Sequence, residues 1–130
     1  DGDAVQYHGI AAVVDKDEAS SFLASELNAD ALLLLTDAKG VIPVEEWNKN
    51  RNSQPPSGDS IVRELHVERV NLADYASGSM RPKLSAAVRF VKHGPERPRM
   101  NDGAPFAAIG NLEDALDILR GKSGTRIVRE

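Results

Sequence analysis

Two short apolar runs flank a segment with helical periodicity, and this arrangement constrains the fold more than any other feature of the sequence. The runs are 10–14 and 31–35, and unbroken apolar runs of this length are typical of strands buried on both faces of a sheet. Between them, apolar residues recur at the spacing of one buried helical face, and Asp17 is suited to cap the helix N-terminus. The residues predicted to form this face are Ala19, Phe22, Leu23 and Leu27. Strand, helix and strand in succession predict a βαβ unit with parallel strands and a right-handed crossover.

The rest of the chain continues the alternation of strands and helices. Apolar patterns predict strands over 61–67, 105–109 and 125–128, and helices over 68–75, 83–93 and 112–120. In the last helix, capped by Asn111 and ended by Gly121, the predicted buried stripe is Leu112, Ala115, Leu116 and Leu119. This alternation predicts one α/β domain over 1–130, built on a layered sheet.

Two polar stretches rich in proline and glycine interrupt this pattern. They are 43–60 and 95–104, and both are predicted to be long loops. A loop of such length in a compact domain is usually functional or mobile. Trp47 lies in the first stretch and is expected to anchor it to the body of the domain.

Composition excludes several classes of function. The chain has no cysteine, which excludes disulfides and thiolate metal sites and is compatible with a reducing compartment. Its net charge of −4 argues against nucleic acid or an anionic membrane as partner. No apolar stretch approaches the roughly 20 residues that span a bilayer, and no signal peptide is recognisable. The chain begins at Asp1 rather than at a methionine, so we expect a piece of a longer protein.

Charged residues gather where the first predicted strand gives way to its helix. Asp15, Lys16 and Asp17 lie there, and a helix N-terminus is a natural place to bind phosphate. A second stretch, 78–83, brings a glycine, a serine and Lys83 to the start of another predicted helix. Two lysines and two carboxylates from separate loops suit phosphoryl transfer, in which the protein mainly positions the reactants and neutralises charge.

Each of these patterns also has a purely structural interpretation. Residues 15–17 are equally typical of a helix cap with solvated charges, and 78–83 of an ordinary turn with Pro82 in the first helical turn. Thr36 and Asp37 follow the second predicted strand, where ligands of open α/β sheets bind, but an aspartate also favours a plain turn. The three histidines are dispersed along the chain, so no histidine metal site is expected.

Four segments together resemble the carboxyl-terminal half of the carbamate kinases, within the amino acid kinase family. In family order they are 9–17 (GIAAVVDKD), 29–37 (ADALLLLTD), 78–83 (GSMRPK) and 121–127 (GKSGTRI). The combination of Asp-Lys-Asp with Gly-Ser-Met-x-Pro-Lys favours the carbamate kinases over the glutamate 5-kinases and acetylglutamate kinases. The resemblance covers most of the chain apart from the two long loops.

The resemblance implies a three-layer αβα sandwich with a mainly parallel sheet and a cytoplasmic, Mg²⁺-dependent, reversible reaction. ATP and carbamate would give ADP and carbamoyl phosphate. Lys16 would lie beside the transferring phosphoryl group, and Asp15 and Asp17 would organise the lysines and metal-bound water. Mg²⁺ would be held through the nucleotide, with Asp17 as the candidate protein contact. The implied catalytic residues are thus Asp15, Lys16, Asp17 and also Lys83, which would neutralise the nucleotide phosphates. The implied nucleotide-binding residues are Thr36, Asp37, Ala38, Gly78, Ser79, Met80 and Lys83.

The amino-terminal half of the family, with its glycine-rich loop and carbamate pocket, has no counterpart in this sequence. We therefore expect the chain to supply the nucleotide side of the site and to be inactive alone. It would associate with an amino-terminal half, or form a homodimer as family members commonly do. The alternative is a non-catalytic module, derived from an amino acid kinase, that binds a nucleotide or a partner protein.

Overall fold

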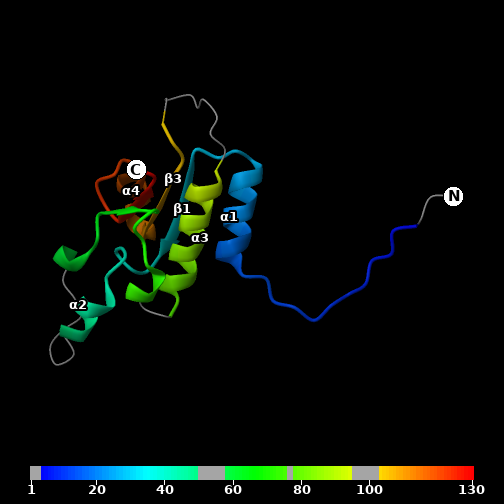
Figure 1. The fold of residues 1–130 in the computed structure, drawn as a ribbon, viewed down its shortest axis with the longest axis horizontal. Coiled ribbons are helices and arrows are strands. Elements are labelled where there is room, and N and C mark those ends of the chain that lie inside the picture. The colour runs from blue at the N-terminus through cyan, green and yellow to red at the C-terminus, as the bar shows by residue number, and fades with distance from the viewer. Residues whose placement is uncertain (1–3, 50–57, 76–77, 95–102) are drawn as a thin grey trace.

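A four-stranded mixed sheet forms the centre of the molecule (Figure 1). The computed structural model describes residues 4–49, 58–75, 78–94 and 103–130. The strands are β1 (Ala31–Thr36), β2 (Glu64–His66), β3 (Phe106–Asn111) and β4 (Thr125–Val128), in the spatial order β1-β3-β4-β2. β1 pairs with β3 and β2 with β4 in parallel, whereas β3 and β4 are antiparallel. The predicted α/β class with a mainly parallel sheet is confirmed.

Helices cover both faces of this sheet. The long helices α1 (Lys16–Glu26) and α3 (Met80–His93) lie side by side, and the short α4 (Ala115–Leu119) packs on β3. α2 (Val44–Lys49) lies away from the sheet, within the first predicted long loop. Short 3₁₀ turns occupy Gly58–Ser60, Leu72–Asp74 and Leu112–Asp114. The helix predicted over 68–75 is thus reduced to one 3₁₀ turn, and most of the second predicted loop, 95–102, lies outside the described residues.

The core lies between α3 and the sheet. Leu84, Phe90 and Val91 of α3 are fully buried against β-strand residues that include Ile109 and Ile127, and the helix predicted over 83–93 is confirmed within Met80–His93. Side chains alternate along β3, so that Gly110 faces the opposite side, towards α4. A Cβ added at Gly110 would lie 2.7 Å from Cδ1 of Ile118 in α4. The layers are therefore helix, sheet and helix.

The predicted buried face of α1 is wrong. Phe22, Leu23 and Leu27 are exposed, and it is Ser21 and Ala24 that face α3. These small residues let the two helices approach closely, and the Ser21 hydroxyl donates a hydrogen bond of 2.9 Å to the backbone oxygen of Ala86. Periodicity had correctly indicated a helix, but the more apolar of its faces is not the one that packs on the body.

The predicted strand at 10–14 is also wrong. Residues 4–14 form an extended arm that leaves α1 and runs away from the body (Figure 1). Ile10 is 84% exposed and Val13 is 99% exposed. An extended segment becomes a strand only by pairing with a neighbour, and among the described residues β1 pairs with β3 alone. The parallel neighbour of β1 is therefore β3, not the segment that precedes α1.

The predicted stripe of the last helix is wrong as well. Leu112, Leu116 and Leu119 are exposed, Ala115 is half-buried, and Ile118 is the residue that α4 buries. The segment begins as a 3₁₀ turn and continues as a short α-helix, which shifts its rotational phase relative to one continuous helix. The glycine at position 110 leaves the space that Ile118 fills.

Candidate functional site

Asp15, rather than Asp17, caps helix α1. Its Oδ1 accepts hydrogen bonds from the backbone N–H groups of Asp17, at 2.8 Å, and Glu18, at 3.1 Å. The bond from Glu18 and then that from Asp17 hold the pKa of Asp15 below its usual value of 3.8, because they stabilise the carboxylate. The cap occupies N–H groups that we had expected to be free for phosphate, and it leaves the Asp17 side chain available for another partner.

That partner is Lys83, in the second turn of α3. Its Nζ donates to Oδ2 of Asp17 at 3.0 Å and to Oδ1 at 3.2 Å. The two side chains are only 11% and 14% exposed, so this ion pair is largely shielded from water and joins the first turn of α1 to α3. A lysine held by both oxygens of one carboxylate has little freedom of position, which is what a preorganised charge requires.

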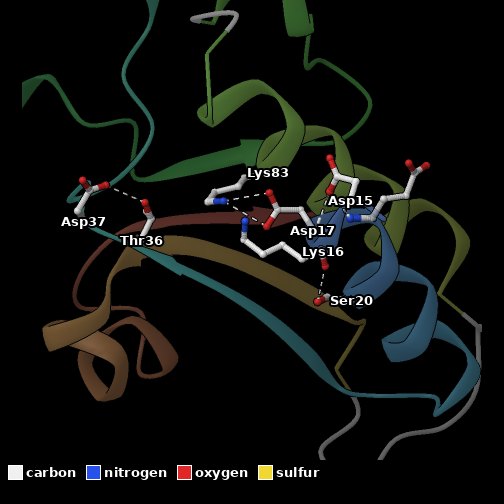
Figure 2. Close-up of polar contacts among 8 residues, drawn as sticks. Asp15, Lys16, Asp17, Ser20, Thr36, Asp37 and Lys83 are labelled. Carbon is white, nitrogen blue, oxygen red and sulfur yellow. Dashed lines mark hydrogen bonds and ion pairs between the residues drawn. The ribbon is translucent and has the colours of Figure 1, made fainter. Parts of the chain in front are cut away.

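Lys16 adjoins this pair. Figure 2 shows its side chain beside Asp17, with the ammonium group on the side that faces Lys83 and the end of β1. The backbone oxygen of Lys16 accepts a 2.7 Å hydrogen bond from the Ser20 hydroxyl, which ties the residue into α1. The sequence-predicted residues Lys16, Asp17 and Lys83 are therefore brought together in space.

Thr36 and Asp37 lie at the carboxyl end of β1, across from the lysines (Figure 2). The Thr36 hydroxyl donates to Oδ1 of Asp37 at 3.0 Å. Nδ2 of Asn111, at the end of β3, donates to the backbone oxygen of Asp37 at 3.1 Å. The two parallel strands are thus fastened where both end, at the edge of the sheet at which open α/β folds bind ligands.

Two hollows meet at the N-terminus of α3. The first, which we call the polar hollow, measures about 340 Å³ and is lined by charged residues. Asp15, Lys16, Asp17 and Lys83 supply its charges, and Val13, Val14, Ser79 and Pro82 complete it. All four residues predicted to be catalytic line this one space.

The second, the apolar hollow, measures about 360 Å³ and has a different character. Its apolar side chains are Ala38, Ile42, Trp47, Ile61 and Met80, and Gly40, Gly58 and Gly78 add backbone. Lys39 and Ser79 are its polar residues. Ser79 lines both hollows, so an apolar space and a lysine-lined space adjoin at one serine.

Helix α3, unlike α1, is not capped by the side chain of its own N-cap residue. Ser79 is the N-cap of α3, but its side chain makes no capping hydrogen bond. N–H groups in the first turn of a helix attract anions, and in α3 no cap from Ser79 competes for them. Of the two helix starts that the sequence indicated for phosphate, this geometry favours the one at Ser79.

Sequence reasoning found the polar hollow and only part of the apolar one. Ala38, Gly78, Ser79 and Met80 had been predicted to contact a nucleotide and do line the apolar hollow, whereas Thr36 and Asp37 lie in the lining of neither. The residues missed are Lys39, Gly40, Ile42, Trp47, Gly58 and Ile61. Trp47, one aromatic residue in a polar stretch, was the available signal.

The part of the chain that the structure describes contains no cluster of three or more histidine, aspartate or glutamate residues suited to a metal ion. The carboxylates that line the polar hollow already have hydrogen-bond partners, since Asp15 caps α1 and both oxygens of Asp17 accept from Lys83. Nor does any described helix combine the length and apolar character needed to cross a membrane.

Several known proteins are similar to this chain in sequence. Residues 1–97 match the amino acid kinase family. Carbamate kinase from Thermoplasma acidophilum is 38% identical over 95% of this chain and 36% of its own length. The enzyme of the same name from Pyrococcus horikoshii is 37% identical over 92% of this chain and 33% of its own. The chain therefore spans about a third of the length of these curated relatives.

Solved structures agree with this relationship. Carbamate kinase from Giardia lamblia bound to AMP-PNP superposes with a TM-score of 0.71 at 32% identity, over 95% of this chain and 38% of that one. N-acetylglutamate synthase from Neisseria gonorrhoeae, complexed with coenzyme A and L-arginine, reaches a TM-score of 0.58 at 22% identity over 89% of this chain and 24% of that one, and shows a shared fold alone.

Proposed function

This chain belongs to the amino acid kinase family, and we propose that it supplies the nucleotide side of a carbamate kinase-type active site. The reaction is the reversible transfer of a phosphoryl group from ATP to carbamate, which gives ADP and carbamoyl phosphate. The observation that carries the proposal is the junction of the apolar and polar hollows at Ser79. A nucleotide has an apolar, planar end and an anionic end, and the two spaces match these ends in order.

The apolar hollow would hold the base and ribose. Its volume of about 360 Å³ lies within the roughly 300–1,000 Å³ of typical ligand pockets. Two glycines in its lining, Gly58 and Gly78, leave open space where a Cβ would be, which allows a ligand to approach the backbone closely. The similar carbamate kinase from Giardia lamblia was solved with AMP-PNP bound, which supports a nucleotide as the ligand.

The polar hollow would hold the phosphates. Lys16 and Lys83 supply two positive charges, and N–H groups at the start of α3, which the Ser79 side chain does not cap, would supply further donors. Asp17 acts as a positioning residue, because both of its oxygens hold the Lys83 ammonium group. Charge that develops on the transferring group would then meet donors already in place, which is the main contribution of proteins to phosphoryl transfer.

Mg²⁺ fits this site only as a companion of the nucleotide. The carboxylates that line the polar hollow are already engaged by a helix terminus and by Lys83, so the phosphate oxygens would provide the ligands from the substrate side. When bound, the ion would supply neutralisation of the phosphate charge. Carbamate would be bound by the part of the fold that the relatives possess and this chain does not span.

The test is calorimetric titration of the chain with MgADP, beside Lys83→Ala and a control, Lys92→Ala. Lys92 lies in the last turn of the same helix and is exposed, far from the hollows. A charge-assisted hydrogen bond contributes about 1.5–3 kcal/mol, so we expect Lys83→Ala to lose roughly ten- to hundredfold in affinity and Lys92→Ala to lose none.

Thermal melting of each variant checks that it is folded. The proposed nucleotide site is refuted if the unmodified chain does not bind MgADP. It is also refuted if Lys83→Ala binds MgADP with the same affinity as the control Lys92→Ala. A longer polypeptide that also contains the rest of the family fold can be tested for phosphoryl transfer. If it binds the nucleotide but transfers no phosphoryl group, the non-catalytic module is favoured instead.

A further inference from the structure

Trp47 lies where the base of a bound nucleotide would be. It is the one tryptophan of the chain and lines the apolar hollow, with 46% of its surface exposed. We infer that the Trp47 indole stacks on the base and that the site accepts purine nucleotides generally, those of adenine and guanine alike. The inference rests on the proposed nucleotide site and adds to it the means by which the base is recognised.

The alternative role for Trp47 is that of an anchor for its loop, which we had expected from the sequence. An anchor buries its ring in the body of the protein. Helix α2, which carries Trp47, has no buried residue, and nearly half of the tryptophan remains accessible. A large aromatic surface left open beside a hollow is better suited to stacking on a planar ligand than to fastening a loop.

The other side chains of the apolar hollow explain why both purines would fit. Ala38, Ile42, Ile61 and Met80 carry no group that reads the hydrogen-bonding edge of a base. Lys39 is exposed and can only donate, which suits the N7 acceptor that adenine and guanine share. These apolar side chains therefore do not distinguish an exocyclic amine from a carbonyl at position 6, and the Ser79 hydroxyl lies at the junction with the polar hollow, on the phosphate side.

Purines would nevertheless be preferred to pyrimidines. Stacking on an aromatic side chain depends on the area of overlap and tolerates different bases, because every base has a π face. The two rings of a purine cover more of an indole than the single ring of a pyrimidine. The expected order of affinity is thus ADP and GDP together, followed by CDP.

Because Trp47 is the one tryptophan, its fluorescence reports directly on the proposed contact. We would titrate the chain with MgADP, MgGDP, MgCDP and magnesium pyrophosphate. The purine nucleotides are expected to change the Trp47 emission and to bind within about tenfold of each other, whereas pyrophosphate is expected to leave the emission unchanged. An unchanged emission when calorimetry detects ADP binding would overturn the inference, as would GDP binding more than about tenfold weaker than ADP.

Two variants separate stacking from anchoring. Trp47→Leu keeps an apolar side chain and removes the aromatic face, while Trp47→Phe retains a smaller ring. Base stacking contributes about 1–3 kcal/mol, so Trp47→Leu should weaken MgADP binding roughly 5- to 150-fold by calorimetry. Trp47→Phe should retain most of the affinity, and pyrophosphate affinity should not change in either. Leu112→Ala, at an exposed apolar residue remote from the hollow, is the control.

Each outcome decides between these roles. An equal loss of ADP and pyrophosphate affinity in Trp47→Leu would identify Trp47 as an anchor and refute stacking, and an unchanged ADP affinity would refute it too. If Lys83→Ala weakens ADP binding and Trp47→Leu does not, the nucleotide site stands and this inference alone fails. If the unmodified chain binds no ADP, both fail together.

Discussion

Gly110 offers a direct test of how α4 is seated on the sheet that carries the site. A Cβ at this position would lie 2.7 Å from Cδ1 of Ile118, 3.2 Å from its Cγ1 and 3.1 Å from Cα of Gly124. All three distances are well inside the roughly 3.5–4.0 Å at which carbon atoms pack. One of these contacts is to backbone, which cannot rotate away, so Gly110→Ala must displace α4 or the turn before β4.

We expect Gly110→Ala to lower the free energy of unfolding by about 2–3 kcal/mol, the upper part of the range for overpacking. Ile118→Val removes the Cδ1 atom that is closest to the added methyl group, and alone should cost about 1 kcal/mol. In the double variant the worst contact is gone. The double variant should therefore lose less free energy of unfolding than the sum of the two single variants, by about 1 kcal/mol.

Urea denaturation followed by circular dichroism measures all three variants. Gly9→Ala is the matched control, because a Cβ at Gly9 would meet nothing within 4 Å, and we expect its effect to be within about 0.5 kcal/mol. A Gly110→Ala protein as stable as the unmodified chain would show that α4 does not lie against β3 as described. Strict additivity in the double variant would show that Ile118 is not what the added methyl group meets.

Two further predictions concern α1. Asp15→Ala should destabilise the chain at neutral pH, because it removes the acceptor for the N–H groups of Asp17 and Glu18. Since the native pKa of Asp15 is below 3.8, this stabilisation is present above that value and is lost as the pH falls through the native pKa. The stability difference between variant and unmodified chain should therefore narrow in acid, and a constant difference would contradict the capping role. Ser21→Ala should lose about 0.5–1.5 kcal/mol with its bond to Ala86, measured by urea denaturation, and Ser25→Ala, nearer the solvent on the same helix, should lose less.

The elements that the sequence predicted correctly are those that contribute buried residues to the core. β1, β3, β4 and α3 are surrounded by the core, so their apolar patterns reflect contacts that the structure contains. Periodicity identifies which face of an element is apolar, but it does not say what covers that face. This is why the leucine-rich faces of α1 and α4 and the segment 10–14 were assigned to the interior and prove to be exposed.

The candidate site was also predicted only in part. The charged residues at the helix starts could be predicted from short stretches of sequence, because a lysine or aspartate at a helix N-terminus indicates its chemistry locally. These residues are Lys16, Asp17 and Lys83. The apolar hollow is assembled from four separate segments, around Ala38, Trp47, Ile61 and Met80. No local pattern links those segments, since their proximity results from the tertiary fold. Asp17 had been predicted as the cap, and only the geometry shows that Asp15 takes that role.

The exposed leucines and phenylalanine of α1 also determine how the chain behaves in solution. Phe22, Leu23 and Leu27 form one accessible stripe, and the arm before α1 adds Val13 and Val14. Exposed apolar side chains of this kind promote association between molecules, whereas the net charge of −4 opposes it. The colloidal stability of the chain is therefore limited by surfaces that lie outside its core. Titrations at high protein concentration would measure self-association together with ligand binding, and dilution separates the two.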